Sequence, residues 1–163
     1  MTEVAGIADF STLVDSEFTD VKFLIGEGSV SGVRALLAFS SPVLRTMLYS
    51  SSFVEGRDAS PCIRIHGVAL APFKTFMTFL HNGRLAPEID AEDLCELLGL
   101  ADRFDVQPLK LACSAMLERH LCLSTAFLLL LQADLYNAAV LRTACLEFIA
   151  AHAGRLFAAP NSE

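Results

Sequence analysis

Residues 18–48, FTDVKFLIGEGSVSGVRALLAFSSPVLRTML, combine two short strand patterns, a glycine-containing turn and two short helix patterns. Val21, Phe23 and Ile25 occupy alternate positions, which predicts a strand over residues 20–25 with one buried face. A strand this short needs partners close by in the chain. The stretch therefore decides the fold, because it supplies both the strand and the elements that cover it.

The second half of the stretch predicts a return strand and two short helices. GEGS at 26–29 is typical of a turn, because glycine tolerates positive φ, and residues 30–33 form the return strand. Residues 34–39 predict a helix, and Ser41-Pro42 begins the next, since serine caps helices and proline fits their first position. The stretch contains neither paired carboxylates nor metal-ligand spacing. It indicates a unit that presents apolar helix surface to another protein.

The flanking regions are predicted to be mostly helical. A helix over residues 7–15 is expected, although two turns alone are unstable in water, so it must dock on other elements. A third strand is expected over residues 62–65. Apolar spacing from residue 69 onward predicts five further helices, with Lys110 and Ser114 pointing away from the core. Their expected start signals are Pro72, Asp90, Pro108, Ser124 and Asn137.

Composition limits the function classes. Among 163 residues, 53% are apolar and 19% charged, with a mean hydropathy of +0.49, which fits equally a surface covered by a partner and a helix-rich core. The net charge of -7 argues against a nucleic-acid partner, because phosphate binding needs a basic patch. The longest apolar run, residues 126–131, is far shorter than the roughly 20 residues that span a membrane. We therefore expect no nucleic-acid partner and no membrane partner.

The cysteines and histidines indicate no chemistry. Five cysteines, an odd number without a CxxC pair, predict free thiols that act as small core hydrophobes in the cytoplasm or nucleus. The four histidines are widely spaced and lie mostly near expected helix ends, where solvated or dipole-stabilised rings are typical. We expect no cofactor, no metal site and no catalytic residue, so an enzyme is disfavoured.

Four segments in one order resemble the BTB (POZ) domain: FTDVKFLI at 18–25, RALLAFSSPVLRTML at 34–48, FMTFLHNGRL at 76–85 and LLGLADRFDVQPLKLAC at 97–113. The resemblance implies an α+β fold, in which a small mixed sheet is flanked by a cluster of short helices and followed by an antiparallel helix pair. The family usually has a histidine before the basic residue Arg34. Val33 stands there, so one local hydrogen bond is expected to differ.

Residues 124–157 are similar to the helix pair called the 3-box, the start of the BACK region in speckle-type and kelch-like cullin adaptors. The resemblance divides the chain into four parts. They are an N-terminal dimerisation helix and lead-in (1–17), the BTB/POZ domain (18–120), the 3-box pair (121–157) and a disordered tail (158–163).

The resemblance also implies a homodimer. The implied interface residues are Phe10, Leu13, Val14, Asp20, Arg34, Leu44, Met47 and Leu48. For the six apolar residues, core packing within one chain remains the alternative. Asp20 and Arg34 alone would be read as solvated residues at element ends, whereas the family places a matching, mutually stabilising pair near the dimer axis.

Phe53, Val54 and Glu55 fit the apolar-x-Glu motif of BTB domains that bind cullin-3. The alternative is a loop phenylalanine tucked onto its own domain. The expected function is a non-enzymatic, dimeric substrate adaptor that recruits the cullin-3 N-terminal domain to an E3 ubiquitin ligase for an unknown substrate protein. The alternative function is a self-association scaffold or corepressor-binding module without a cullin.

Overall fold

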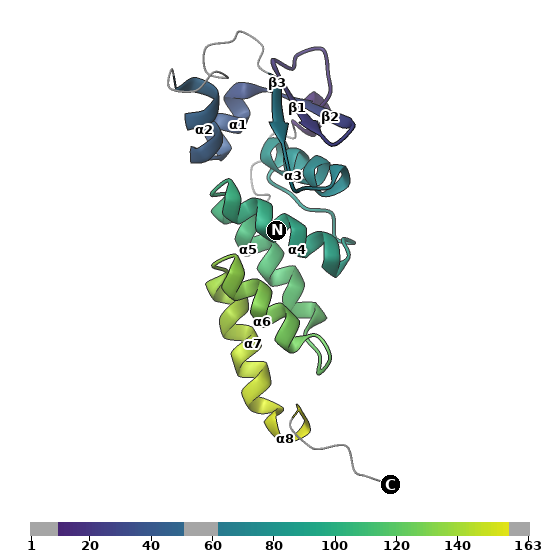
Figure 1. Ribbon diagram of the computed structural model, residues 1–163, viewed down its shortest axis with the longest axis vertical. Coiled ribbons are helices and arrows are strands. Elements are labelled where there is room, and N and C mark those ends of the chain that lie inside the picture. Colours follow the sequence, from purple (N-terminus) through teal and green to yellow (C-terminus); the bar gives the residue numbers. More distant parts are fainter. Residues whose placement is uncertain (1–9, 51–61, 157–163) are drawn as a thin grey trace, which may run out of the picture.

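The computed structural model describes residues 10–50 and 62–156, and the following bounds refer to those residues. The elements are η1 (Ser11–Leu13), β1 (Val21–Ile25), β2 (Gly28–Gly32), α1 (Arg34–Ser40), α2 (Pro42–Tyr49), β3 (Cys62–Ile65), α3 (Leu70–Asn82), α4 (Ala91–Arg103), α5 (Gln107–Leu117), η2 (Glu118–His120), α6 (Ala126–Leu135), α7 (Ala139–Ala151) and α8 (Ala153–Leu156). Figure 1 shows them as a column, with the sheet at one end and α6 to α8 at the other.

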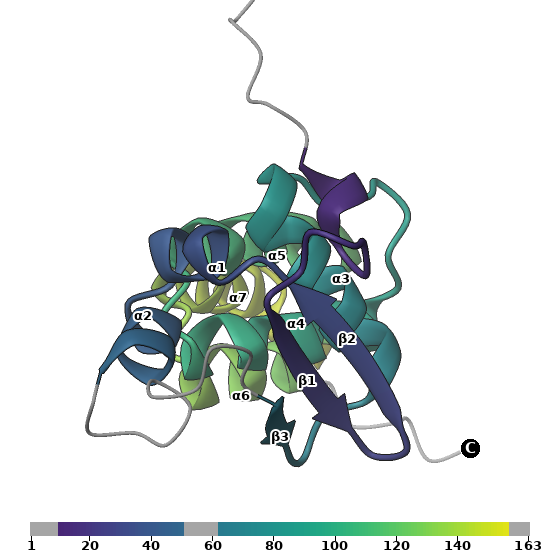
Figure 2. The same cartoon turned by 90° about the horizontal axis from the view of Figure 1, so that it is seen from above.

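The sheet has three strands in the order β2-β1-β3 and lies at one end of the column (Figure 1); seen from above, β1 and β2 run side by side (Figure 2). Phe23 pairs with Val30 on antiparallel β2 and with Ile63 on parallel β3. Val21, Phe23 and Ile25 are buried, as their alternation predicted. The mixed sheet of the sequence analysis is therefore confirmed.

The return strand begins earlier than the sequence predicted. Gly28 already pairs with Ile25 across a two-residue turn, in which Gly26 has a φ of +57°. That left-handed conformation suits glycine, and it lets the two strands meet directly. The pairing therefore adds Gly28 and Ser29 to the predicted strand.

A run of buried aromatic rings connects the sheet to the helices. The ring centroids of Phe23 and Phe73 lie 5.5 Å apart, those of Phe73 and Phe76 5.7 Å, and those of Phe76 and Phe104 5.2 Å. Burying each side chain stabilises the fold by about 1.5–3 kcal/mol. The run fixes β1, α3 and the end of α4 as one core.

The predicted start and stop signals hold at three helices. Ser41 Oγ accepts a hydrogen bond from the Leu44 N–H at 3.1 Å, and Asp90 Oδ1 accepts one from the Asp93 N–H at 2.8 Å. Gly83, with a φ of +69°, ends α3. Side-chain caps and a left-handed glycine satisfy main-chain groups that helix ends leave open.

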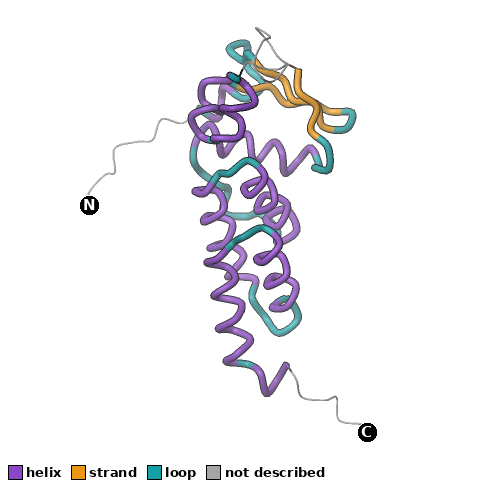
Figure 3. The backbone as a smooth tube through the Cα atoms, turned by 60° about the vertical axis from the view of Figure 1, so that its left-hand side comes forward, coloured by secondary structure: helices purple, strands orange, loops and turns teal. Residues whose placement is uncertain are grey.

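The helices after the sheet pack as two successive pairs. α4 packs against α5, α6 packs against α7, and α7 contacts α5, which places the second pair beneath the first (Figures 1 and 3). The expected α+β architecture, a small mixed sheet with short helices and a following helix pair, is confirmed. None of the helices in the described part of the chain combines the length and the apolar run that crossing a membrane requires.

Three predicted boundaries were wrong. In place of a helix over 7–15, the described part of that segment holds only the short η1, and Asp15 follows with a φ of +56°. Ser124 does not cap α6. The residue directly before α6 is Thr125, and the Thr125 hydroxyl donates to the His120 carbonyl instead of capping the helix. Asn137 lies before α7 with a φ of +51°, which is incompatible with a helical turn.

Two polar residues expected on the surface are buried. Lys110 is 8% exposed and its ammonium bonds to Asp102 on α4 at 2.7 Å. Ser114 is buried one turn later, where its hydroxyl donates to the Lys110 carbonyl at 2.8 Å. Each burial is possible because a partner compensates the lost hydration.

Candidate protein-interaction surfaces

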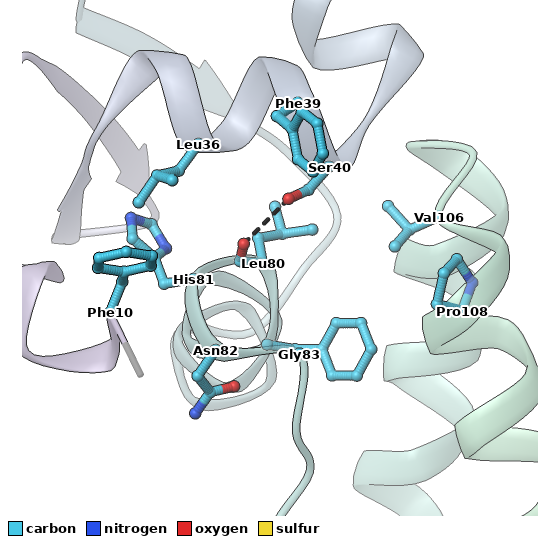
Figure 4. A pocket seen from close by; sticks show the side chains of 11 residues that line it. Phe10, Leu36, Phe39, Ser40, Leu80, His81, Asn82, Gly83, Val106 and Pro108 are labelled. Carbon is cyan, nitrogen blue, oxygen red and sulfur yellow. Dashed lines mark hydrogen bonds between the residues drawn. The ribbon is translucent and has the colours of Figure 1, made fainter. Parts of the chain in front are cut away.

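An apolar groove lies between α1, the end of α3 and the start of α5. It has a volume of about 500 Å³, and its lining includes three aromatic rings, those of Phe10, Phe39 and Phe79. Figure 4 shows Phe10 beside His81 at one end of the groove, with Leu36 and Phe39 on α1 above it. Because α1 follows β2 directly, the sheet sets the position of this wall.

The short helix α1 is apolar on two faces. Leu37 and Ala38 are buried in the core, whereas Phe39 is 83% exposed and, with Leu36, lines the groove. Leu36 and Phe39 are three residues apart, so they share a face of the helix. Neither residue was predicted to lie on an interaction surface, although apolar residues on both sides of a seven-residue helix were the available signal.

His81 lies in the last turn of α3, near a helix end as expected, but it is 4% exposed in the wall of the groove and not solvated. Its Nδ1 lies 2.7 Å from the Met77 carbonyl oxygen, and its Nε2 accepts a hydrogen bond from the Val33 N–H at 3.4 Å. Burial lowers the pKa of the imidazole, and the Met77 carbonyl opposes this only in part. These main-chain partners on two elements make the buried ring tolerable.

The apolar residues predicted for the dimer interface fall into two groups. Leu44 and Leu48 are 1% and 0% exposed and belong to the core of the chain, which is the alternative that the sequence left open. A partner could not touch their side chains. Val14 and Met47 pack partly buried against that core, Leu13 is also partly buried, and Phe10 is 41% exposed.

Asp20 and Arg34 are in contact, but the Asp20 carboxylate bonds to the backbone N–H of Arg34. Asp20 Oδ1 accepts a hydrogen bond from the Arg34 backbone N–H at 2.7 Å. The Arg34 guanidinium donates to the Leu48 carbonyl and lies 4.9 Å from the Tyr49 ring centroid, a cation–π contact. Asp20 is exposed and Arg34 is partly buried, so the contact orders the entry to α1.

A second apolar surface lies along α6. Phe127, Leu128, Leu131 and Leu135 are all about half exposed or more. Leu128, Leu131 and Leu135 follow the i, i+3, i+7 spacing of one helix face. Exposed apolar patches of this kind mark interaction sites more often than isolated exposed residues do.

A groove of about 430 Å³ adjoins this surface. Gly67 and Val68, just after β3, form one wall, α4 contributes Glu96 and Asp102, and Leu135 closes the far side. Leu135 therefore belongs both to the exposed α6 face and to the groove. Phe53, Val54 and Glu55 lie between α2 and β3 in the sequence, outside the described residues.

Little in the described residues suggests chemistry. Their His, Cys, Asp and Glu side chains form no group of three that could hold a metal ion. All five cysteines are free: Cys113 and Cys145 are buried, but Cys62 and Cys122 are exposed, so the prediction of core thiols was wrong for those two. Hydrogen bonds from Ser124 and Thr125 lower the pKa of the Cys122 thiol to about 7.

Comparison with known proteins agrees with this architecture. The BTB/POZ domain family matches residues 10–121. The chain is 33% identical over 140 residues to TD and POZ domain-containing protein 2 of Mus musculus, a match that covers 85% of this chain and 37% of the relative. It is 29% identical over 151 residues to BTB/POZ domain-containing protein 9 of Drosophila melanogaster, which covers 91% of this chain and 20% of the relative.

A solved structure shows the same fold. The BTB domain of zebrafish PATZ1 superposes with a TM-score of 0.52 at 19% identity, over 63% of this chain and 77% of that one. This likeness concerns the fold alone. The family match over residues 10–121, the mixed sheet and the short helices around it agree with one another, and the chain belongs to the BTB/POZ domain family.

Proposed function

We propose that the chain is a homodimeric, non-enzymatic adaptor that recruits the N-terminal domain of cullin-3 to an E3 ubiquitin ligase. As a BTB/POZ domain the chain is a protein-interaction module. The observation that carries the finer assignment is the exposed apolar face of α6, which continues through Leu135 into the groove beside β3. This surface is extended, and it is apolar enough to seat amphipathic helices.

The groove beside α1 supports self-association. Phe39 and Phe10 are exposed aromatic side chains around an apolar hollow, and aromatic residues in such hollows dominate the energy of many interfaces. A second copy placed across a two-fold axis would bury both rings in an isologous contact. Leu13, Val14 and Met47, together with Asp20 and Arg34, remain the proposed flanks of this interface.

Cullin binding is proposed for the second surface, formed by the α6 face and the groove beside β3. The Phe53-Val54-Glu55 segment precedes β3, and the groove wall at Gly67 and Val68 follows it. A phenyl ring from that segment and the α6 leucines could contact one helical partner. Helix pair α6–α7, proposed as the 3-box, supplies the second half of the surface. The substrate of the ligase is unidentified, and the chain spans little more than a third of the first relative.

The test uses two reciprocal variants. The double substitution Leu128→Ser and Leu131→Ser changes exposed side chains on α6, and Phe39→Ser changes the exposed ring on α1. We expect that the α6 variant no longer captures the cullin-3 N-terminal domain in a pulldown, whereas it still sediments as a dimer. The Phe39 variant should become monomeric at micromolar concentration and still bind cullin-3.

A second pair of substitutions, Phe53→Ala with Glu55→Ala, should also abolish cullin-3 capture and leave the dimer intact. Unchanged capture by both this variant and the α6 variant would refute the cullin assignment. A wild-type dimer without cullin binding would instead indicate a self-association scaffold. A wild-type monomer of 17.6 kDa at micromolar concentration would refute the dimer.

A further inference from the structure

His81 is the single titratable side chain among the described residues that line the groove beside α1. A carbonyl oxygen only accepts, so the Met77 contact places the proton on Nδ1. Nε2 is then the acceptor for the Val33 N–H, at the joint between β2 and α1. Both contacts are satisfied only by the neutral ring with this tautomer.

Protonation would disturb two things at once. A proton on Nε2 would face the Val33 N–H, so that two donors oppose each other where a hydrogen bond had been. The positive charge would also sit at 4% exposure in a groove lined mostly by apolar side chains. Relief requires the ring to leave the joint, and this movement reshapes the wall that carries Leu36 and Phe39.

We propose that His81 makes self-association sensitive to acid: its protonation loosens the Val33 joint and weakens the binding of a second copy across the groove. This inference rests on the proposed homodimer. A second copy that covers the groove would contact its wall in the shape that the neutral His81 ring holds in place. It would therefore bind the neutral form more tightly, and by linkage acid would favour the separate chains.

The charged groups nearby do not offset this effect. Those carried by or beside the elements packed around His81 are Asp15, Glu17, Asp20, Glu27, Arg34, Lys74, Arg84, Asp105 and Lys110, and none of them lines the groove. Asp15 bonds to the Ser31 N–H, Asp20 to the Arg34 N–H, and Lys110 to Asp102. The Arg34 guanidinium reaches the Leu48 carbonyl on α2. No described carboxylate is thus positioned in the groove to pair with an imidazolium.

The direction in which burial moves the pKa of His81 agrees with a preference for the neutral ring. Burial lowers the pKa of His81 below its ordinary value of 6.5, so the folded chain resists protonation that the free imidazole would accept. A second copy lowers it further. The dimer dissociation constant should therefore be flat above pH 7 and rise by about tenfold as pH falls from 7.5 to 5.0, because His81 takes up a proton more readily in the separate chains than in the dimer.

Sedimentation equilibrium of the full chain at pH 7.5, 6.5, 5.5 and 5.0 measures this constant. We expect the rise in wild type and a flat profile in His81→Gln, because the glutamine amide can accept from the Val33 N–H but does not titrate in this range. His120→Gln, at an exposed histidine, is the matched control and should keep the rise.

NMR of the wild type provides a measurement independent of any variant. The Val33 amide should shift with the same midpoint as the His81 ring, and that midpoint should lie below the ordinary pKa of histidine. A flat wild-type profile, a rise that persists in folded His81→Gln, or a Val33 amide that does not follow His81 would overturn the switch. A monomer at pH 7.5 would refute the self-association on which it rests, whereas a dimer insensitive to pH would refute the switch alone.

Discussion

Lys110 Nζ lies 2.7 Å from Asp102 Oδ1, and this ion pair joins α5 to α4 at the middle of the column. The Lys110 side chain is 10% exposed and that of Asp102 31%. The same carboxylate oxygen lies 3.5 Å from Asn137 Nδ2, in the turn between α6 and α7. One carboxylate therefore connects the family domain to the helix pair that follows it.

Replacement of Lys110 by methionine should lower the free energy of unfolding by about 1–2 kcal/mol, because it leaves the Asp102 carboxylate without its cation. The loss should stay below that of a fully buried pair, since water reaches Asp102. Urea unfolding measures it.

The matched control for this substitution is Arg142→Ala. It removes an equally short ion pair, 2.6 Å to Asp134, whose two side chains are 52% and 54% exposed. Exposed pairs contribute little, so the change should stay below about 0.5 kcal/mol. Equal losses in the two variants would contradict the role given to burial.

Ser41→Ala should be the more costly of two cap substitutions. Ser41 is fully buried, its Oγ accepts from the Leu44 N–H, and it donates to the Phe104 carbonyl at 2.5 Å. Alanine removes both bonds and leaves a buried carbonyl unsatisfied, at about 2–3 kcal/mol. Asp90→Ala removes only an exposed cap on α4 and should cost about 1 kcal/mol. Thermal unfolding that ranks Asp90→Ala as the more harmful would contradict this.

The sequence predicted elements whose signals are local. Alternation identified β1, and Ser41-Pro42, Asp90 and Asn82-Gly83 marked helix ends correctly, because each signal acts over a few residues. The predictions that Lys110 and His81 lie in solvent were wrong for the opposite reason. Helical spacing assigns polar residues to the surface, whereas the groups that make their burial possible lie on other elements: Asp102 on the preceding helix and the Val33 N–H 48 residues away.

The interaction surfaces were predictable only in part. Apolar residues on short helices suggested a partner surface, but the sequence could not separate the core residues Leu44 and Leu48 from exposed ones such as Phe10. Phe39 was missed because α1 is too short for its two faces to appear as a pattern. The Val33 backbone N–H donates to a histidine 48 residues away, and this bond does not depend on the side chain at position 33. Spacing in the sequence could not predict it.

Cys122 should be the first cysteine to react with iodoacetamide. It is exposed, and the hydroxyls of Ser124 and Thr125, 3.1 and 3.3 Å from Sγ, favour the thiolate and lower the pKa to about 7. Its alkylation rate should therefore rise with pH and reach half its plateau near pH 7. Mass spectrometry of the native chain after short exposures measures the rate at each cysteine.

The other cysteines provide the internal controls. Cys113 is buried, and burial together with Cys95 raises the pKa of its thiol to about 12, so it should react only after unfolding. Cys62 is exposed without such hydroxyl partners among its described contacts and should react more slowly than Cys122 at pH 7. Substitution of Ser124 by alanine should move the Cys122 profile to higher pH. A profile that stays in place would show that the hydroxyl does not set it.

The effect of Gly99→Ala on the free energy of unfolding should change sign when the Tyr136 ring is removed. A Cβ at Gly99, on α4, would lie 3.0 Å from Cζ and 3.2 Å from Cε1 of the Tyr136 ring, which packs from the end of α6. In the wild-type chain this crowding should outweigh the helix propensity gained and lower the free energy of unfolding by about 1 kcal/mol. In a Tyr136→Ala background the ring is absent, and the same substitution should raise it by about 0.5–1 kcal/mol. Denaturant unfolding of the four chains gives the coupling energy directly, and additive effects would show that α4 and α6 do not press on each other at this point.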